Sequence, residues 1–242
     1  MTILVAGATG ATGRLLAGQL LDRGDTVKMV VRDPGRLPDA VKNHPRAVVM
    51  TGTILDLGDH ELVELVRGCD AVALCLGHNL SMRGIFGHPR RLVADTTRRL
   101  CQAIRETRPA RPVRFVLMNT VANSNRDIPE SRTVAERCVI GLIRALVPPQ
   151  PDNEEAAEYL RTAVGKDDAS ISWVVVRPDS LTDEMAVTEY DVHPSPVRSG
   201  VFDPGKTSRI NVGHFMAAVI GENALWDRWK GQMPVIYNRQ PA

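Results

Sequence analysis

Seven residues near the amino terminus have the types and spacing to bind a nucleotide phosphate. Gly7, Gly10 and Gly13 follow directly on a short apolar run, and apolar residues at helical spacing come after them. In this order of strand, turn and helix, the first glycine permits the tight turn and the second lets the backbone approach a pyrophosphate. The third lets the helix pack close to the strand. The free N–H groups and positive dipole end of that helix then hold the phosphates.

The pattern therefore predicts a dinucleotide site. The alternative is a glycine- and threonine-rich loop without a ligand, which leaves the flanking strand and helix unexplained. The predicted cofactor contacts in this turn are Gly7, Thr9, Gly10, Ala11, Thr12 and Gly13.

The end of the second predicted strand, 26–31, bears on which dinucleotide is bound. Arg32 and Asp33 follow this strand, and Arg36 comes four residues after Arg32. In a dinucleotide fold, an acidic residue here accepts from the 2′-hydroxyl of NAD, whereas an arginine accommodates the 2′-phosphate of NADP. Because guanidinium groups suit phosphate oxygens, Arg32 and Arg36 favour NADP(H). Asp33 leaves NAD open, and two solvated surface arginines are the alternative without a ligand.

Two further strand ends provide candidate cofactor contacts. Asp56 comes shortly after the third predicted strand, and it either caps the helix expected over 59–67 or reaches the adenine amino group. The apolar run 71–76 predicts a buried strand that ends at Leu76 and Gly77. A glycine at this point lets a cofactor lie close to the backbone.

Polar residues after the next two predicted strands indicate a substrate site. Asn119 and Thr120 follow the strand 113–118 and are expected to face the nicotinamide and the substrate. Thr120 is the candidate for a hydrogen bond to a substrate carbonyl or ring atom, with turn formation as its alternative role. Pro178 and Ser180 follow the strand expected over 172–176, and we predict a cofactor contact for Pro178.

Two irregular segments, about 78–91 and 184–207, are expected on the substrate side as walls or lids, with plain surface loops as the alternative. The histidines of the first segment, His78 and His88, have no third ligand nearby, so no metal site is predicted. The proline-rich run 148–152 is expected to break the chain and cap a helix over 153–164.

Length and composition agree with one α/β domain over all 242 residues. The glycine turn and the order of the predicted strands and helices indicate a doubly wound, Rossmann-type parallel sheet. The net charge of +2, with mixed signs, gives no indication of a nucleic acid or membrane partner. The four cysteines form no C-x-x-C pair, which argues against a metal or redox site built from cysteines. No apolar run approaches the ~20 residues of a membrane span. The first predicted strand begins at the amino terminus, so no signal peptide is expected. We therefore expect a cytoplasmic protein with a small-molecule substrate.

Over nearly its whole length the chain resembles an atypical, or extended-type, short-chain dehydrogenase/reductase with an NmrA-like NAD(P)-binding domain. It is most similar to the flavin reductase and biliverdin-IXβ reductase branch. The resemblance implies a parallel sheet with NADP(H) across its carboxyl edge and hydride transfer to a flat, conjugated acceptor. The stretches that carry it are the glycine turn 7–13, Val31-Arg32-Asp33, Gly68-Cys69-Asp70-Ala71-Val72, Pro148-Pro149, Val176-Arg177-Pro178 and Leu181-Thr182-Asp183.

Departures from that family concern the proton donor. Ordinary short-chain dehydrogenases use a Tyr-x-x-x-Lys pair, but Ala163, Pro194 and Pro241 stand four residues after the three tyrosines. Where the flavin and biliverdin branch has a serine and then a histidine, this chain has Thr120 and Ser180. The hydroxyl is kept at the first position and the imidazole is lost at the second.

The sequence therefore leaves three functions open. The first is an NADPH-dependent reductase of a flavin, quinone or enone, in which Thr120 and Ser180 are the catalytic candidates and solvent supplies the proton. The second is an NADP(H)-binding sensor or regulator of the NmrA-like kind without catalysis. The third is a non-redox isomerase or cyclase on the same scaffold. The two substrate-side segments favour the reductase.

Overall fold

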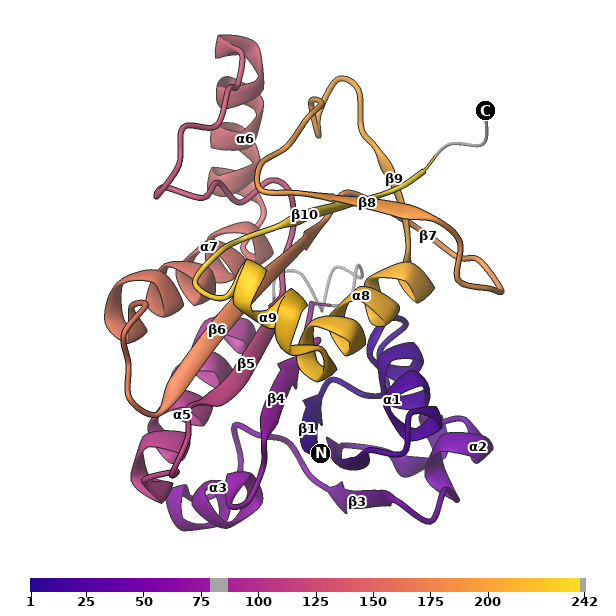
Figure 1. Ribbon diagram of the computed structural model, residues 1–242. Coiled ribbons are helices and arrows are strands. Elements are labelled where there is room, and N and C mark those ends of the chain that lie inside the picture. The colour runs from indigo at the N-terminus through magenta and orange to yellow at the C-terminus, as the bar shows by residue number, and fades with distance from the viewer. Residues whose placement is uncertain (79–86, 240–242) are drawn as a thin grey trace.

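The computed structural model describes residues 1–78 and 87–239, and most of the first predicted irregular segment lies outside them. Figure 1 shows a twisted sheet with helices on both of its faces. Within the described residues the sheet has eight strands in the order β3-β2-β1-β4-β5-β6-β10-β8, parallel except for β8. The α/β, doubly wound prediction is confirmed.

The strands and helices have the following bounds. The sheet contains β1 (Thr2–Ala6), β2 (Thr26–Val31), β3 (Ala47–Thr51), β4 (Ala71–Leu74), β5 (Val113–Met118), β6 (Ile171–Pro178), β8 (Tyr190–His193) and β10 (Val235–Asn238). A separate pair is formed by β7 (Ser180–Thr182) and β9 (Lys206–Ser208). The α-helices are α1 (Gly13–Asp22), α2 (Asp39–Lys42), α3 (Asp59–Val66), α5 (Leu92–Thr107), α6 (Val134–Leu146), α7 (Pro149–Tyr159), α8 (Arg209–Gly221) and α9 (Asn223–Trp229).

The central strands are apolar on both faces because helices cover both faces. In β1, Leu4 packs with side chains of α3, α5 and α7, whereas the adjacent Ile3 and Val5 pack with side chains of α1, α8 and α9. All three are fully buried. This is the continuous apolar pattern expected of a parallel strand with two covered faces. Since β1 lies between β2 and β4, the strand order reverses direction at β1 and opens a crevice at its carboxyl end.

Helix α7 begins four residues before the predicted start at residue 153, so that part of the prediction is wrong. Pro149 and Pro151 lie in its first turn, where a helix needs no N–H donors, and therefore do not break it. The helix continues as a π-helical turn, η2 (Leu160–Val164), so the predicted end is confirmed. Asp152, expected to cap α7, is buried in its first turn and accepts hydrogen bonds from α5.

The segment 184–207, expected to be irregular, contains part of the sheet. Its strand β8 pairs antiparallel with β10, and its end enters β9, which pairs with β7. In Figure 1 the chain between β8 and β9 arches beyond the carboxyl ends of the parallel strands, near α6. The segment thus extends the sheet and also overhangs the edge at which the candidate site lies.

Arg177 near the end of β6 connects the loops around this edge, and its Nη2 also lies 3.4 Å from the Pro194 carbonyl oxygen of the overhanging segment. Its side chain is fully buried and donates to the carbonyl oxygens of Met233 and Asn123, both at 2.7 Å. Its Nη2 lies 2.7 Å from Glu130 Oε1, and this carboxylate is also buried. Burial lowers the pKa of the Arg177 guanidinium, while the adjacent Glu130 carboxylate opposes that shift. One side chain therefore fixes the loops after β5 and before β10.

In the described part of the chain, no helix combines the length and apolar character needed to cross a bilayer.

Replacing Arg177 by methionine should destabilise the protein by about 3–5 kcal/mol, because it leaves the Glu130 carboxylate buried without its main partner. The combined variant Arg177→Met with Glu130→Gln should recover part of that loss, since the uncompensated charge is then removed. Denaturant unfolding measures the stability of both variants. Arg126→Met, at a guanidinium that is 58% exposed, serves as the control and should change stability by less than about 0.5 kcal/mol. A loss below about 1 kcal/mol for Arg177→Met contradicts the assigned role.

Candidate functional site

Three close backbone approaches shape the glycine turn after β1. Gly7 has φ +88°, and a Cβ on it would lie 2.6 Å from the Cys75 carbonyl oxygen. A Cβ on Gly13 would lie 2.2 Å from the Gly7 carbonyl oxygen, so α1 packs directly on the turn. The Gly10 N–H donates to that same oxygen at 2.9 Å. Gly7 and Gly13 therefore occupy positions that a larger residue would disrupt, whereas a Cβ on Gly10 would make a tight contact of 3.1 Å with the Gly7 carbonyl oxygen.

The start of α1 presents unpaired donors. Within the described chain, the backbone N–H groups of Ala11, Thr12 and Gly13 have no hydrogen-bond acceptor. Thr12 is the N-cap residue, but its side chain makes no capping hydrogen bond, and the first turn holds no acidic residue. Three free donors at the positive end of a helix form an anion site. Ala11 is exposed, whereas Thr9 is half-buried and Thr12 buried.

After β2, two arginine side chains are available to bind an anionic group. The side chains of Arg32 and Arg36 are exposed, and neither has an ion-pair or hydrogen-bond partner among the described residues. Asp33 lies between them, and its Oδ1 accepts from the Gly35 N–H at 2.9 Å, which caps the short 3₁₀ helix η1 (Pro34–Arg36). Since β2 lies next to β1, these arginines stand at the same edge as the glycine turn.

Asp56 does not cap α3, so the capping alternative is wrong. The N-cap residue of α3 is Gly58, and its N–H donates to the Glu61 carboxylate at 2.7 Å. Glu61 is the residue three positions into the helix whose side chain reaches back to the cap. Asp56 remains exposed on the loop after β3, the strand adjacent to β2. Its proposed contact with adenine stays a prediction.

At the end of β4, Leu76 is half-buried and Gly77 is exposed. Next in the chain, His78 Nε2 lies 2.8 Å from Asp152 Oδ2, and both side chains are almost fully buried. The two oxygens of Asp152 also accept the Val93 and Ala94 N–H groups at the start of α5, each at 2.9 Å. Asp152 thus joins the end of β4, the start of α5 and the start of α7.

The sequence indicated none of these contacts, because His78 and Asp152 are 74 positions apart. From the sequence, His78 belongs to an irregular segment without a predicted metal site, and its bond to Asp152 is not anticipated. No group of three or more histidine, cysteine or acidic side chains with metal-binding geometry occurs in residues 1–78 and 87–239.

The ends of β5 and β6 lie together. The Asn119 N–H donates to the Val176 carbonyl at 2.8 Å, and the Val121 N–H to the Pro178 carbonyl at 3.0 Å. Asn119 turns its side chain inward: Oδ1 accepts from the Thr120 N–H, and Nδ2 donates to the Asn153 carbonyl of α7. The Asn119 side chain therefore orients the turn that carries Thr120.

The two predicted catalytic hydroxyls differ in their surroundings. Thr120 is half-buried, and its Oγ1 accepts from the Ala122 N–H at 3.3 Å, which is a weak turn-forming contact. Ser180 is exposed in β7, where its N–H donates to the Gly205 carbonyl. Thr120 lies one residue before Val121, which is bonded to Pro178. It is thus placed close to the end of β6.

Two titratable groups near Pro178 were not identified from the sequence. Burial raises the pKa of the Asp179 carboxyl, although its Oδ2 accepts from the Gly205 N–H at 2.9 Å. Tyr237 of β10 follows Ile236, the residue paired with Pro178, and packs against Gly205. Burial also raises the pKa of Tyr237 to about 12, so its phenol stays protonated at neutral pH.

At the carboxyl edge of the parallel strands, the described residues therefore combine an anion-binding turn, two guanidinium groups without partners and hydroxyl groups at the ends of neighbouring strands. The free amides and the glycine cradle fit a dinucleotide. The turn would hold the pyrophosphate, and the residues after β4, β5 and β6 would surround the nicotinamide end.

Comparison with known families agrees with this geometry. Residues 7–223 match the model of a family described as NAD(P)H-binding. An uncharacterised chloroplastic protein of Arabidopsis thaliana is 33% identical over 73 residues, which cover 30% of this chain and 26% of that protein.

Solved structures share the fold along the entire chain. An oxidoreductase of Lactococcus lactis aligns with a TM-score of 0.69 and 16% identity, covering 100% of this chain and 93% of that one. A short-chain dehydrogenase/reductase of Veillonella parvula in complex with NADP has a TM-score of 0.68 and 13% identity, covering 98% and 94%. A Streptococcus pneumoniae protein assigned as an NADH-flavin reductase has a TM-score of 0.66 and 13% identity, covering 99% and 100%.

The raised pKa of Asp179 predicts a pH-dependent gain from Asp179→Asn. A carboxyl whose pKa is raised by folding contributes stability below its unfolded value of about 3.9 and loses it as pH rises through the folded value. Asparagine does not titrate and keeps an acceptor for the Gly205 N–H. The variant should therefore gain stability relative to the wild type between about pH 4 and pH 8, as measured by denaturant unfolding. A relative loss over that range shows that the fold favours the ionised carboxylate.

Proposed function

Because the chain belongs to the NAD(P)H-binding family, we propose that it is an NADPH-dependent oxidoreductase acting on a conjugated small molecule. The acceptor class is a flavin, a quinone or an enone. The observation that carries the proposal is the set of three free amides at the start of α1, held against the end of β4 by the glycine turn. When bound, the nicotinamide supplies the hydride.

Selectivity for NADPH rests on the residues after β2. Arg32 and Arg36 are exposed and unpaired in the described chain, so both are available to a 2′-phosphate. The alternative partner for NAD, Asp33, already has one carboxylate oxygen bonded to the Gly35 N–H. One structural neighbour is bound to NADP and another is assigned as an NADH-flavin reductase, so the choice of NADPH rests on the two arginines.

The residues around the nicotinamide end have positioning roles in this proposal. Thr120 lies on a turn whose conformation is held by Asn119 and, through it, by α7. Its hydroxyl donates to a carbonyl or ring atom of the acceptor, and the exposed Ser180 hydroxyl is a second donor. Holding the acceptor against the cofactor supplies most of the rate.

Solvent supplies the proton in this scheme. No lysine stands four residues after any of the three tyrosines, so the usual tyrosine–lysine pair is missing. Flavins, quinones and enones accept hydride onto an extended π system, so the proton can follow from water. The Streptococcus pneumoniae neighbour assigned to flavin reduction supports this acceptor class. We also propose a cytoplasmic location, supported by the four free cysteines.

The test is NADPH oxidation followed by absorbance with a panel of free flavins, quinones and enones, repeated with NADH. Turnover that prefers NADPH supports the proposal and identifies the acceptor class. Tight NADPH binding without turnover across the panel contradicts the reductase and favours the NADP(H)-binding sensor.

Arg32→Ala should weaken NADPH binding about tenfold or more while changing NADH binding little, because only NADPH carries the 2′-phosphate. Equilibrium titration of both cofactors measures the difference. Lys42→Ala, which removes an exposed cation in α2, is the matched control and should change neither affinity. Equal weakening of NADPH and NADH by Arg32→Ala would rule out the 2′-phosphate contact.

Thr120→Ala should lower kcat about tenfold with the acceptor found in the panel and leave the NADPH dissociation constant within about twofold. Thr120→Ser keeps the hydroxyl and should restore most of the turnover. An unchanged kcat in the alanine variant removes Thr120 from the site. A parallel loss of NADPH affinity would instead indicate a structural role in the turn.

A further inference from the structure

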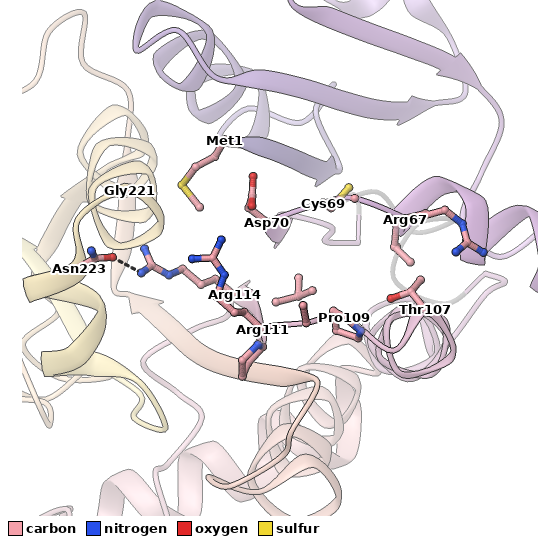
Figure 2. A pocket seen from close by; sticks show the side chains of 15 residues that line it. Met1, Arg67, Cys69, Asp70, Thr107, Pro109, Arg111, Arg114, Gly221 and Asn223 are labelled. Atoms are coloured by element: carbon pink, nitrogen blue, oxygen red, sulfur yellow. Dashed lines mark hydrogen bonds between the residues drawn. The ribbon is translucent and has the colours of Figure 1, made fainter.

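A cavity lies at the amino-terminal edge of the sheet, opposite the edge that carries the glycine turn. Its volume is about 520 Å³, which falls in the range of ligand sites. It is bounded by the amino terminus of β1, the loop 67–70 before β4, the loop 109–112 before β5 and the junction of α8 with α9. Figure 2 shows the side chains of Arg111 and Arg114 extending into this cavity. The glycine turn lies at the other end of the strands.

Arg114 is held in the cavity wall by neutral groups. Its Nη1 donates to the Ile220 carbonyl at 2.6 Å, its Nη2 donates to Asn223 Oδ1, and the guanidinium lies 5.1 Å from the centre of the Trp226 ring. No carboxylate in the described chain forms an ion pair with it. Burial lowers its pKa, and Asp227 and Asp70 oppose that shift from a distance. The guanidinium remains charged at neutral pH and is fixed without a counter-ion.

Arg111 adds a second unpaired cation. Its side chain is exposed and has no hydrogen-bond or ion-pair partner among the described residues. Pro109 and Pro112 flank it and restrict the backbone of the loop that carries it. The Arg111 side chain can therefore close over a ligand without rearranging the loop.

The other charges of the lining are largely compensated. Arg67 pairs with Glu64, and the Met1 ammonium pairs with Asp25, both at 2.9 Å. Asp70 is the acidic side chain of the lining, and its Oδ2 accepts from the Thr2 N–H at 2.7 Å. Arg111 and Arg114 thus face one carboxylate, which leaves a net positive charge in the cavity.

We propose that this cavity binds the phosphate group of a phosphorylated small molecule, at a site separate from the dinucleotide edge. The free guanidinium fork of Arg111 matches the geometry of a phosphate, and Arg114, whose Nη1 and Nη2 each already donate one hydrogen bond, adds a fixed positive charge beside it. The volume leaves space for an organic part beside the phosphate, and Val66 and Val113 supply apolar lining. The Asp70 carboxylate repels the anion and limits the affinity.

The test is a titration of the full-length, ¹⁵N-labelled protein with inorganic phosphate, followed by amide NMR shifts. Saturable shifts are expected for the amides of Ala110, Arg111, Val113 and Arg114 and of residues 221–223. Arg111→Gln should weaken phosphate binding about three- to tenfold at these residues, and Asp70→Asn should tighten it, because asparagine keeps the acceptor for Thr2 and removes the repelling charge. Arg108→Gln, at an exposed arginine outside the lining, is the control and should change nothing.

The same spectra distinguish phosphate bound in this cavity from phosphate bound at the glycine turn. Shifts of the Ala11–Gly13 amides report phosphate at the glycine turn and should be the same in Arg111→Gln as in the wild type. Absence of a saturable response at Ala110, Arg111, Val113 and Arg114, or a response that neither Arg111→Gln nor Asp70→Asn changes, overturns the proposal. Either outcome is independent of whether the protein reduces an acceptor.

Discussion

The contact between the turn after β1 and the end of β4 is the constraint on which the candidate site depends. Gly7 approaches the Cys75 carbonyl so closely that a Cβ would lie 2.6 Å from it, and Gly13 approaches Gly7 more closely still. These approaches bring the start of α1 over the strand crevice and leave three amides there without acceptors among residues 1–78 and 87–239. Cofactor binding and the packing of α1 are therefore two consequences of the same backbone geometry.

Buried polar side chains fix the backbone around the other strand ends, on the side where the substrate is expected. Asp152 fixes His78 after β4 and the start of α5, and the next residue, Asn153, accepts from Asn119 beside Thr120. Arg177 holds the loops that follow β5 and precede β10. Because buried charges and amides are costly to leave unpaired, these contacts favour one arrangement of the edge.

The sequence predicted correctly the features that depend on residues close to one another in the chain. The glycine spacing, the apolar strands and the arginines after β2 are local patterns, and the sheet order and exposed Arg32 agree with them. It failed where the partner is distant in sequence. The run that contains Asp152 predicts a cap for its own helix, but Asp152 bonds α5. The contact between the Asn119 side chain and α7 was not predicted either, and the place of Asn119 beside the nicotinamide stays a prediction.

Local chemistry also misled in two places. The prolines of 148–152 suggest helix breakers although they fit a first turn, and Asp56 suggests an N-cap although Gly58 is the N-cap residue of α3 and donates to Glu61. Strand β8 was not predicted because its residues pair only once β10 offers an edge. The roles of Thr120, Ser180, Asp56 and Pro178 toward ligands remain predictions.

Binding of the cofactor by the free amides of the glycine turn can be followed by hydrogen–deuterium exchange of the protein with and without NADPH, because bound phosphate oxygens would accept from those N–H groups. We expect slower exchange in the peptide covering Ala11–Gly13 when NADPH is present. Unchanged exchange there at NADPH concentrations that saturate binding would show that the cofactor binds elsewhere on the molecule.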